Sequence, residues 1–186
     1  VSPKAPTPGS NKACEVCNIS ARISSQKKDI EKADALLLPG VGAFGETMSN
    51  LKQLGLVKPI KDFVDSGRPL FGICIGLQLL FSESLEFGLT KGLNLINGKV
   101  EKISFENQEI YKNFRIPFIG WNKIEFKNKS SLFEQIKEDD YFYFVHSYCA
   151  KLDISSDLVA SSTYGDQQIT AAIERNNIFA TQFHPE

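Results

Sequence analysis

Cys74 lies between two glycines, at a point where an apolar strand would run directly into an apolar helix. Residues 70–73 predict the strand and residues 77–81 the helix. So sharp a turn needs Gly72 and Gly76, because larger side chains would collide with the neighbouring backbone. The N-terminus of the helix favours the thiolate form of the cysteine. The pattern indicates a cysteine nucleophile, and a buried structural cysteine is the alternative.

The last residues of the chain supply a base for such a nucleophile. Side chains alternate in an extended segment, so His184 and Glu186 project to the same side, and Pro185 stiffens the backbone between them. A carboxylate beside an imidazole fixes its tautomer and stabilises the imidazolium. We therefore expect a catalytic triad of Cys74, His184 and Glu186, although a structural histidine is the alternative for His184 taken alone.

An acyl-transfer site also needs donors aimed at the developing oxyanion. The backbone N–H of Ile75, directly after the nucleophile, is one candidate. The second is expected from the glycine-rich loop 39–42, which includes Gly40 and Gly42 and follows a predicted strand. A simple turn is the alternative interpretation of this loop.

The pattern of elements predicts one α/β domain over residues 1–186, with 1–12 as a loop or tail. The apolar run 35–38 is typical of a strand buried on both faces of a parallel sheet, and the helices expected at 44–54 and 56–66 stop at glycines. This alternation indicates a doubly wound, mostly parallel sheet with helices on both faces. An antiparallel β extension follows. Other expected elements are a helix at 11–18 and strands at 19–23, 98–105, 118–122, 141–148, 158–164, 168–175 and 178–183, with a hairpin turn at 176–177.

Composition excludes several classes of partner. The 186 residues carry a net charge of −1 and no lysine or arginine cluster, so we expect neither nucleic acid nor an anionic membrane surface. We expect no leader, because the first residues lack a charged-then-apolar pattern, and no membrane span, because no apolar run is long enough, and four cysteines fit a reducing compartment. We expect a cytoplasmic protein.

Cys14 and Cys17 have the spacing of a redox or zinc motif. A zinc site needs further ligands, and the chain has only two histidines, His146 and His184, which are better used elsewhere. Two small residues on an N-terminal helix are the favoured interpretation. We expect neither a metal nor a cofactor.

Four segments, in this order, resemble the motifs of class I (triad) glutamine amidotransferases. They are Leu38-Pro-Gly-Val-Gly42, Gly72-Ile-Cys-Ile-Gly-Leu-Gln78, Phe144-Val-His-Ser-Tyr148 and Gln182-Phe-His-Pro-Glu186. Within that family the chain is most similar to the glutaminase subunits of imidazole glycerol phosphate synthases. The closer resemblance depends on segments 38–45, 92–96, 119–122 and 141–148, and it extends from about residue 32 to residue 186.

The resemblance implies a reaction and a set of roles. Cys74 would attack the side-chain amide of glutamine, giving ammonia and a glutamyl thioester that water then hydrolyses. His184 would act as base and then acid, and Glu186 would orient it. The remaining implied site residues are the oxyanion loop Gly40, Val41 and Gly42, the Ile75 N–H, and the glutamine-holding residues Gln78, Ser147 and Tyr148.

The resemblance also implies a partner. Ammonia would pass to a (β/α)₈-barrel cyclase subunit in a heterodimer, which makes imidazole glycerol phosphate and AICAR in histidine biosynthesis. Three departures leave alternatives open. The family's first strand and last helix are not evident, and Phe118 stands where these synthases usually have histidine. The alternatives are a paralogous subunit that feeds ammonia to another synthase, such as a sugar amidotransferase, a stand-alone γ-glutamyl or peptide cysteine hydrolase, and a non-catalytic binding subunit. Phe118 and Trp121 belong either to the core or to an interface, and the core is the favoured expectation.

Overall fold

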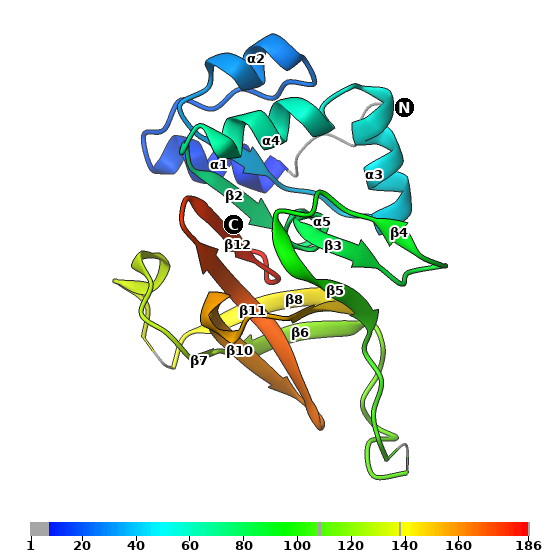
Figure 1. Cartoon of the computed structure of the whole chain (residues 1–186). Coiled ribbons are helices and arrows are strands. Elements are labelled where there is room, and N and C mark those ends of the chain that lie inside the picture. Colours follow the sequence, from blue (N-terminus) through cyan, green and yellow to red (C-terminus); the bar gives the residue numbers. More distant parts are fainter. Residues whose placement is uncertain (1–7, 108, 138, 186) are drawn as a thin grey trace.

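A computed structural model describes residues 8–107, 109–137 and 139–185 of the chain (Figure 1). The helices are α1 (Pro8–Val16), α2 (Lys27–Lys32), α3 (Phe44–Gln53), α4 (Val57–Asp65) and α5 (Ile75–Leu79), with short 3₁₀ turns at Ser131–Phe133 and Ser155–Asp157. The strands are β1 (Leu36–Leu38), β2 (Leu70–Ile73), β3 (Phe81–Ser84), β4 (Thr90–Lys91), β5 (Ile96–Lys102), β6 (Phe118–Lys123), β7 (Glu125–Phe126), β8 (Tyr141–His146), β9 (Tyr148–Leu152), β10 (Leu158–Tyr164), β11 (Gln167–Arg175) and β12 (Ile178–Thr181).

The largest sheet joins a parallel part to an antiparallel part. Its order is β1-β2-β12-β11-β10-β7, in which β1, β2 and β12 run parallel and the remaining pairs are antiparallel. A four-stranded sheet, β4-β3-β5-β9, and a two-stranded sheet, β6-β8, complete the structure. In Figure 1 the helices gather at one end of the molecule and the antiparallel strands at the other. The expected α/β fold class with an antiparallel extension is confirmed, but the largest sheet is not mostly parallel, because parallel pairing is confined to β1, β2 and β12.

Two helices end just before a glycine, as the sequence predicts. The C-terminal cap residues of α3 and α4 are Leu54 and Ser66. Each is followed by a glycine with positive φ, 66° at Gly55 and 81° at Gly67. Glycine adopts this left-handed conformation without the steric cost that a Cβ would impose. The hairpin turn expected at 176–177 is also confirmed, since Arg175 pairs with Ile178 between β11 and β12.

Some elements differ from the expectation. α1 begins at Pro8, so the tail expected over 1–12 is wrong for residues 8–12, and residues 1–7 lie outside the described part. α5 starts at Ile75 and ends at Leu79, and Phe81 already belongs to β3. The three leucines of β1 are half-buried, not fully buried, because β1 is the first strand of its sheet and pairs only with β2 among the described strands.

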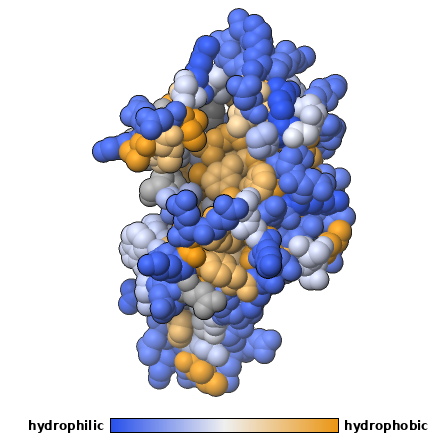
Figure 2. All heavy atoms as spheres, turned by 90° about the vertical axis from the view of Figure 1, so that its left-hand side faces the viewer, coloured by the Kyte–Doolittle hydropathy of each residue, from blue (hydrophilic) through white to orange (hydrophobic). Residues whose placement is uncertain are grey.

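The strand expected at 19–23 is absent from the structure. Residues 18–26 form neither helix nor strand, and the side chains of Ile19 and Ile23 are 58% and 49% exposed. This segment lies at the left of Figure 1, and Figure 2 shows that hydrophobic residues reach the surface on that side of the molecule. Its apolar residues favour a strand locally, but no described strand pairs with it.

Within the described ranges, no helix has both the length and the apolar character that crossing a bilayer requires.

Candidate active site

Cys74 occupies a strained corner between β2 and α5. Its backbone has φ 55° and ψ −110°, a region that non-glycine residues rarely adopt, and its side chain is only 6% exposed. A Cβ atom at Gly76 would lie 1.7 Å from the Leu38 carbonyl oxygen, and one at Gly72 would lie 2.9 Å from the Gly76 carbonyl. The steric reason for the two glycines is confirmed, and the geometry is that of a nucleophile elbow.

β12 brings the distant end of the chain to this corner. It runs parallel to β2 with Thr181 opposite Ile73, and the Cys74 N–H donates to the Thr181 carbonyl oxygen at 2.8 Å. Parallel neighbours end at the same edge of a sheet, so the residues after Thr181 emerge beside the cysteine. This pairing brings the segment Gln182, Phe183 and His184 to the corner at Cys74.

A second strand fixes the backbone of the histidine. His184 forms an isolated antiparallel bridge with Tyr143 of β8, and its N–H donates to the Tyr143 carbonyl oxygen at 2.9 Å. His184 is thereby held between the end of β12 and the aromatic strand β8. Glu186, the expected third member of the triad, lies outside the described residues.

The glycine-rich loop 39–42 lies against the start of α5. A Cβ at Gly40 would lie 2.9 Å from Cγ2 of Ile75, so the loop and the elbow helix are in close contact. Gly42 has φ 128° with no atom within 4 Å of an added Cβ, and Val41 is 50% exposed. The structure therefore brings the two candidate oxyanion donors, Val41 and Ile75, to neighbouring segments.

A carboxylate holds the far end of this loop. The Phe44 N–H, the first of α3, donates to Oε2 of Glu86 at 2.6 Å. This charge-assisted bond satisfies one of the free N–H groups at the helix N-terminus and ties the loop to the β3–β4 connection.

Gln78 and Tyr148, expected to hold glutamine, are joined directly. The Gln78 Nε2 donates to the Tyr148 carbonyl oxygen at 2.9 Å and to Oε1 of Gln182 at 2.9 Å. Both hydrogens of the Gln78 amide are thus used within the protein, so only its Oε1 can accept from a substrate ammonium group. Ser147 is half-buried, and its carbonyl oxygen accepts from the Ile103 N–H at 2.9 Å.

A second buried histidine adjoins this cluster. His146 Nδ1 lies 2.9 Å from the Tyr148 carbonyl oxygen, so Nδ1 carries the proton and donates. The pKa of His146 is lowered from 6.5 to about 4, because burial and, to a smaller extent, the nearby His184 outweigh the opposing effect of the Tyr148 bond. Its Nε2 is buried with no hydrogen-bond partner among the described residues. His146 is therefore neutral at pH 7.

Sequence reasoning did not single out Gln182, Glu86 or His146. Gln182 had a usable signal, because it stands two positions before His184 and alternation puts both side chains on one side of an extended segment. Its Nε2 lies 3.7 Å from Sγ of Cys74. Glu86 and His146 are placed by long-range packing, and the local sequence carries no sign of their contacts.

The two aromatic residues expected in the core have different positions. Phe118 is 4% exposed, stacks on Tyr164 with ring centroids 4.0 Å apart and also packs on Phe144, so that expectation is confirmed. Trp121 is 67% exposed, so the expectation is wrong for it. Both lie on β6, but their side chains project to opposite faces of the strand.

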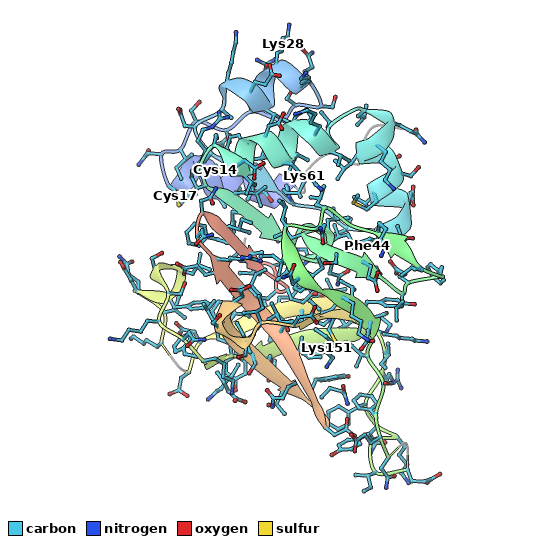
Figure 3. All side chains as sticks on the ribbon, viewed as in Figure 1. Cys14, Cys17, Lys28, Phe44, Lys61 and Lys151 are labelled. Carbon is cyan, nitrogen blue, oxygen red and sulfur yellow. The ribbon has the colours of Figure 1, made fainter. Side chains whose placement is uncertain are left out.

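Cys14 and Cys17 lie away from this site. Figure 3 shows Cys14 and Cys17 at α1, on the opposite side of the molecule from Phe44 at the start of α3. Cys14 belongs to α1, as the favoured interpretation expects, and Cys17 follows its last residue. In the described part of the chain, no group of three or more histidine, cysteine or acidic residues has an arrangement suited to a metal ion.

Known proteins share this combination of sequence and fold. The protein-family model "Glutamine amidotransferase class-I" matches residues 10–186. The chain belongs to this family. The resemblance seen in the four motifs is therefore confirmed, and this class I glutamine amidotransferase is an enzyme by family.

Among curated proteins, this amidotransferase is 43% identical over 175 residues to "Imidazole glycerol phosphate synthase subunit HisH" of Chlorobium chlorochromatii, covering 94% of this chain and 84% of that one. The protein of the same name from Geobacter metallireducens is 42% identical over 175 residues, with 94% and 83% covered. Both matches include most of each chain.

Solved structures share the fold at lower identity. A "glutamine amidotransferase" crystal structure superposes with a TM-score of 0.70 at 20% identity, covering 95% of this chain and 83% of that one. PurLQS from Thermotoga maritima gives a TM-score of 0.70 at 18% identity, with 100% and 84% covered. At these identities the likeness concerns the fold alone.

Proposed function

We propose that this amidotransferase is the glutaminase subunit of an imidazole glycerol phosphate synthase, acting in the cytoplasm in histidine biosynthesis. The observation that carries the proposal is the parallel pairing of β12 with β2, which places the segment containing His184 beside the strained Cys74. The curated relatives at about 40% identity bear the same name.

In the proposed reaction, Cys74 transfers its proton to His184 and attacks the side-chain carbonyl carbon of glutamine. The oxyanion of the tetrahedral intermediate accepts from the N–H groups of Val41 and Ile75. His184 returns the proton to the leaving nitrogen, so that ammonia departs and a glutamyl thioester remains. Water, deprotonated by His184, then releases glutamate and regenerates the thiol. Glu186 orients the imidazole throughout.

Substrate binding uses the cluster around Tyr148. Gln78 offers Oε1 to the α-ammonium group of glutamine, because its amide hydrogens are taken. The backbone at Ser147 and Tyr148, together with Gly40 and Gly42, completes the site for the α-carboxylate and the amide. Ammonia is largely protonated at neutral pH and ammonium is not a nucleophile, so it must reach its acceptor without entering bulk water.

The acceptor belongs to a (β/α)₈-barrel cyclase partner in the proposed heterodimer. Support comes from the outer face of the β6–β8 ladder, where Ile119, Trp121 and Tyr141 are 59%, 67% and 56% exposed. Such an exposed aromatic cluster is typical of a protein interface. It is continuous with the site, because Trp121 pairs with Tyr143 and Tyr143 bridges His184. Phe118, the departure from the synthases, faces inward and does not contribute to this surface.

The test compares Cys74→Ala with the unchanged protein in a glutamate-release assay, with and without the cyclase subunit. We expect Cys74→Ala to lose at least about 10⁴-fold in turnover, as for removal of other catalytic nucleophiles, and to remain folded. Normal turnover in that variant would refute the proposal. Rapid hydrolysis of glutamine or γ-glutamyl compounds that no cyclase subunit stimulates would favour a stand-alone hydrolase.

A surface variant tests the partner separately. Trp121→Ala should weaken binding to the cyclase subunit about tenfold or more, as expected for an aromatic anchor, while stability changes by less than about 0.5 kcal/mol. Val16→Ala, at a position on α1 that is 75% exposed, is the matched control and should leave binding unchanged. Equal affinity for both variants, measured by calorimetry, would exclude this face as the docking surface.

A further inference from the structure

A buried row of amide groups connects the substrate-holding region to the nucleophile. The Tyr148 carbonyl oxygen accepts from Gln78 Nε2 at 2.9 Å, Gln78 Nε2 also donates to Gln182 Oε1 at 2.9 Å, and Gln182 Nε2 lies 3.7 Å from Sγ of Cys74. Gln78 is 5% exposed and Gln182 is 0% exposed. Two buried glutamine side chains therefore form a continuous path of hydrogen bonds to the sulfur.

The direction of every bond in this row is fixed by one backbone group. A carbonyl oxygen can only accept, so the Gln78 atom facing Tyr148 must be its NH₂ group. The same NH₂ group faces the side chain of Gln182, so the Gln182 atom there must be its oxygen. The other end of the Gln182 amide, which faces Cys74, is then its NH₂ group. The sulfur is consequently the acceptor in this contact.

The backbone around Gln182 holds this donor in place. The Gln182 N–H donates to the Ala171 carbonyl oxygen at 2.8 Å, and the preceding Thr181 carbonyl accepts from the Cys74 N–H at 2.8 Å. Gln182 and Cys74 are therefore fixed relative to each other, each directly after one of two neighbouring parallel strands. A donor held in advance costs little reorganisation when charge develops on its acceptor.

We propose that Gln182 is a thiolate-stabilising residue, whose side-chain N–H donates to Sγ of Cys74 and favours its ionised form, and that Gln78 acts through Gln182 by fixing the orientation of its amide. A bond to a charged sulfur is stronger than one to a neutral thiol, so the contact favours ionisation. This proposal deepens the proposed function and depends on Cys74 being the nucleophile.

The experiment measures alkylation of Cys74 by iodoacetamide against pH in the full chain, with each cysteine followed by peptide mass spectrometry. In Gln182→Met, which keeps the length of the side chain and removes the donor, the pH midpoint should rise by about one pH unit and the rate at pH 7 should fall about tenfold. The plateau rate at high pH should stay unchanged, because access to the sulfur is preserved. Cys149, which is 1% exposed, serves as an internal measure of unfolding.

Gln78→Met provides a second variant that leaves Gln182 in place. It should shift the midpoint in the same direction by a smaller amount, and Gln78→Met/Gln182→Met should be no worse than Gln182→Met alone, because Gln78 acts through Gln182. Gln53→Met, on the exposed end of α3, is the matched control and should not move the midpoint. If Gln182→Met does not fold, the Gln78→Met midpoint tests the proposal instead, and an unchanged midpoint in that variant would overturn it.

An unchanged midpoint in a folded Gln182→Met protein would overturn the proposal, as would a change in plateau rate alone, which indicates altered access. Additive shifts in the double variant would overturn the part assigned to Gln78. Iodoacetamide needs no glutamine, so these outcomes are independent of the glutaminase assay of Cys74→Ala. If the glutaminase assay contradicts the proposed function, the alkylation midpoints can still be interpreted. If the midpoints contradict the role of Gln182, the glutaminase assay can still be interpreted.

Discussion

On one side of Cys74 the structure is closely packed, and on the other it is open. The packed side consists of β2, α5 and β12, where an added Cβ at Gly76 would meet the Leu38 carbonyl oxygen at 1.7 Å and where Gln182 is fully buried. The open side is the loop 39–42, where an added Cβ at Gly42 meets no atom within 4 Å and Val41 is half exposed. Cys74, the proposed nucleophile, belongs to the packed side, with the proposed base His184 beyond the end of β12, and Val41, a proposed oxyanion donor, belongs to the open side.

This difference separates two requirements of the proposed chemistry, a nucleophile held in a strained conformation and a donor for the oxyanion. The corner at Cys74 is strained, and such a conformation persists only where the surrounding packing determines it. The candidate oxyanion loop has no such packing around Gly42, and it is held instead at Gly40 by Ile75 and at its far end by the bond from Phe44 to Glu86. The candidate nucleophile is therefore held by packing, whereas the middle of the candidate oxyanion loop lies in open space.

The largest effect is expected at Gly76. Gly76→Ala should lower the free energy of unfolding by at least about 4 kcal/mol or prevent folding, because its Cβ would overlap the backbone of β1. Gly45→Ala is a matched control at the same second position of a helix, α3, where the added Cβ would lie 3.5 Å from Oγ1 of Thr90. It should be neutral or stabilising by up to about 1 kcal/mol. Similar urea midpoints for Gly76→Ala and Gly45→Ala would show that the packed side can accommodate a Cβ at position 76.

A pH-dependent effect is expected from His146, which is buried at the end of β8, outside the two sides compared above. Its pKa is about 4 in the folded protein against 6.5 in its ordinary state, so the unfolded chain binds the proton first as pH falls. Stability is therefore fully present above pH 6.5 and decreases as pH falls toward 4, by up to about 3 kcal/mol from this group.

Urea unfolding at pH 7 and at pH 4.5 measures this contribution. His146→Gln removes the titrating group, so its stability should fall less over that range than that of the unchanged protein. Parallel loss in the two proteins would mean that His146 is not buried in neutral form. Lys28→Gln, at an exposed position on α2, is a control for the general effect of changing a charge.

The smallest effect on stability is expected on the open side. Gly42→Ala introduces strain at φ 128° without any clash and should cost about 1 to 2 kcal/mol of stability. Turnover of glutamine should nevertheless fall tenfold or more if the loop carries an oxyanion donor, as proposed.

Gly55→Ala is the control for backbone strain at a distance from the site. Gly55 also has positive φ, 66°, with open space around an added Cβ. This variant should lose about 1 kcal/mol with unchanged kcat. Equal loss of kcat in Gly42→Ala and Gly55→Ala would show that the loop 39–42 has no special role in turnover.

The sequence was most informative where a few adjacent residues meet a local requirement. The glycines at 72 and 76 predicted the elbow, and Gly55 and Gly67 predicted the ends of α3 and α4, because steric limits on the backbone act within a few residues. The alternation of Gln182 and His184 likewise holds for any extended segment. The isoleucines at 19 and 23 show the limit, since an apolar run forms a strand only where another strand pairs with it.

Tertiary structure alone decided which distant groups meet and which faces are covered. Gln182 and Cys74 stand 108 positions apart, and their contact exists because β12 pairs with β2 in one register. Phe118 and Trp121, three positions apart on β6, differ in exposure because only one face of the β6–β8 ladder packs on the core. Local sterics are encoded in neighbouring residues, whereas strand order, register and the burial of a face follow from the packing of the whole chain.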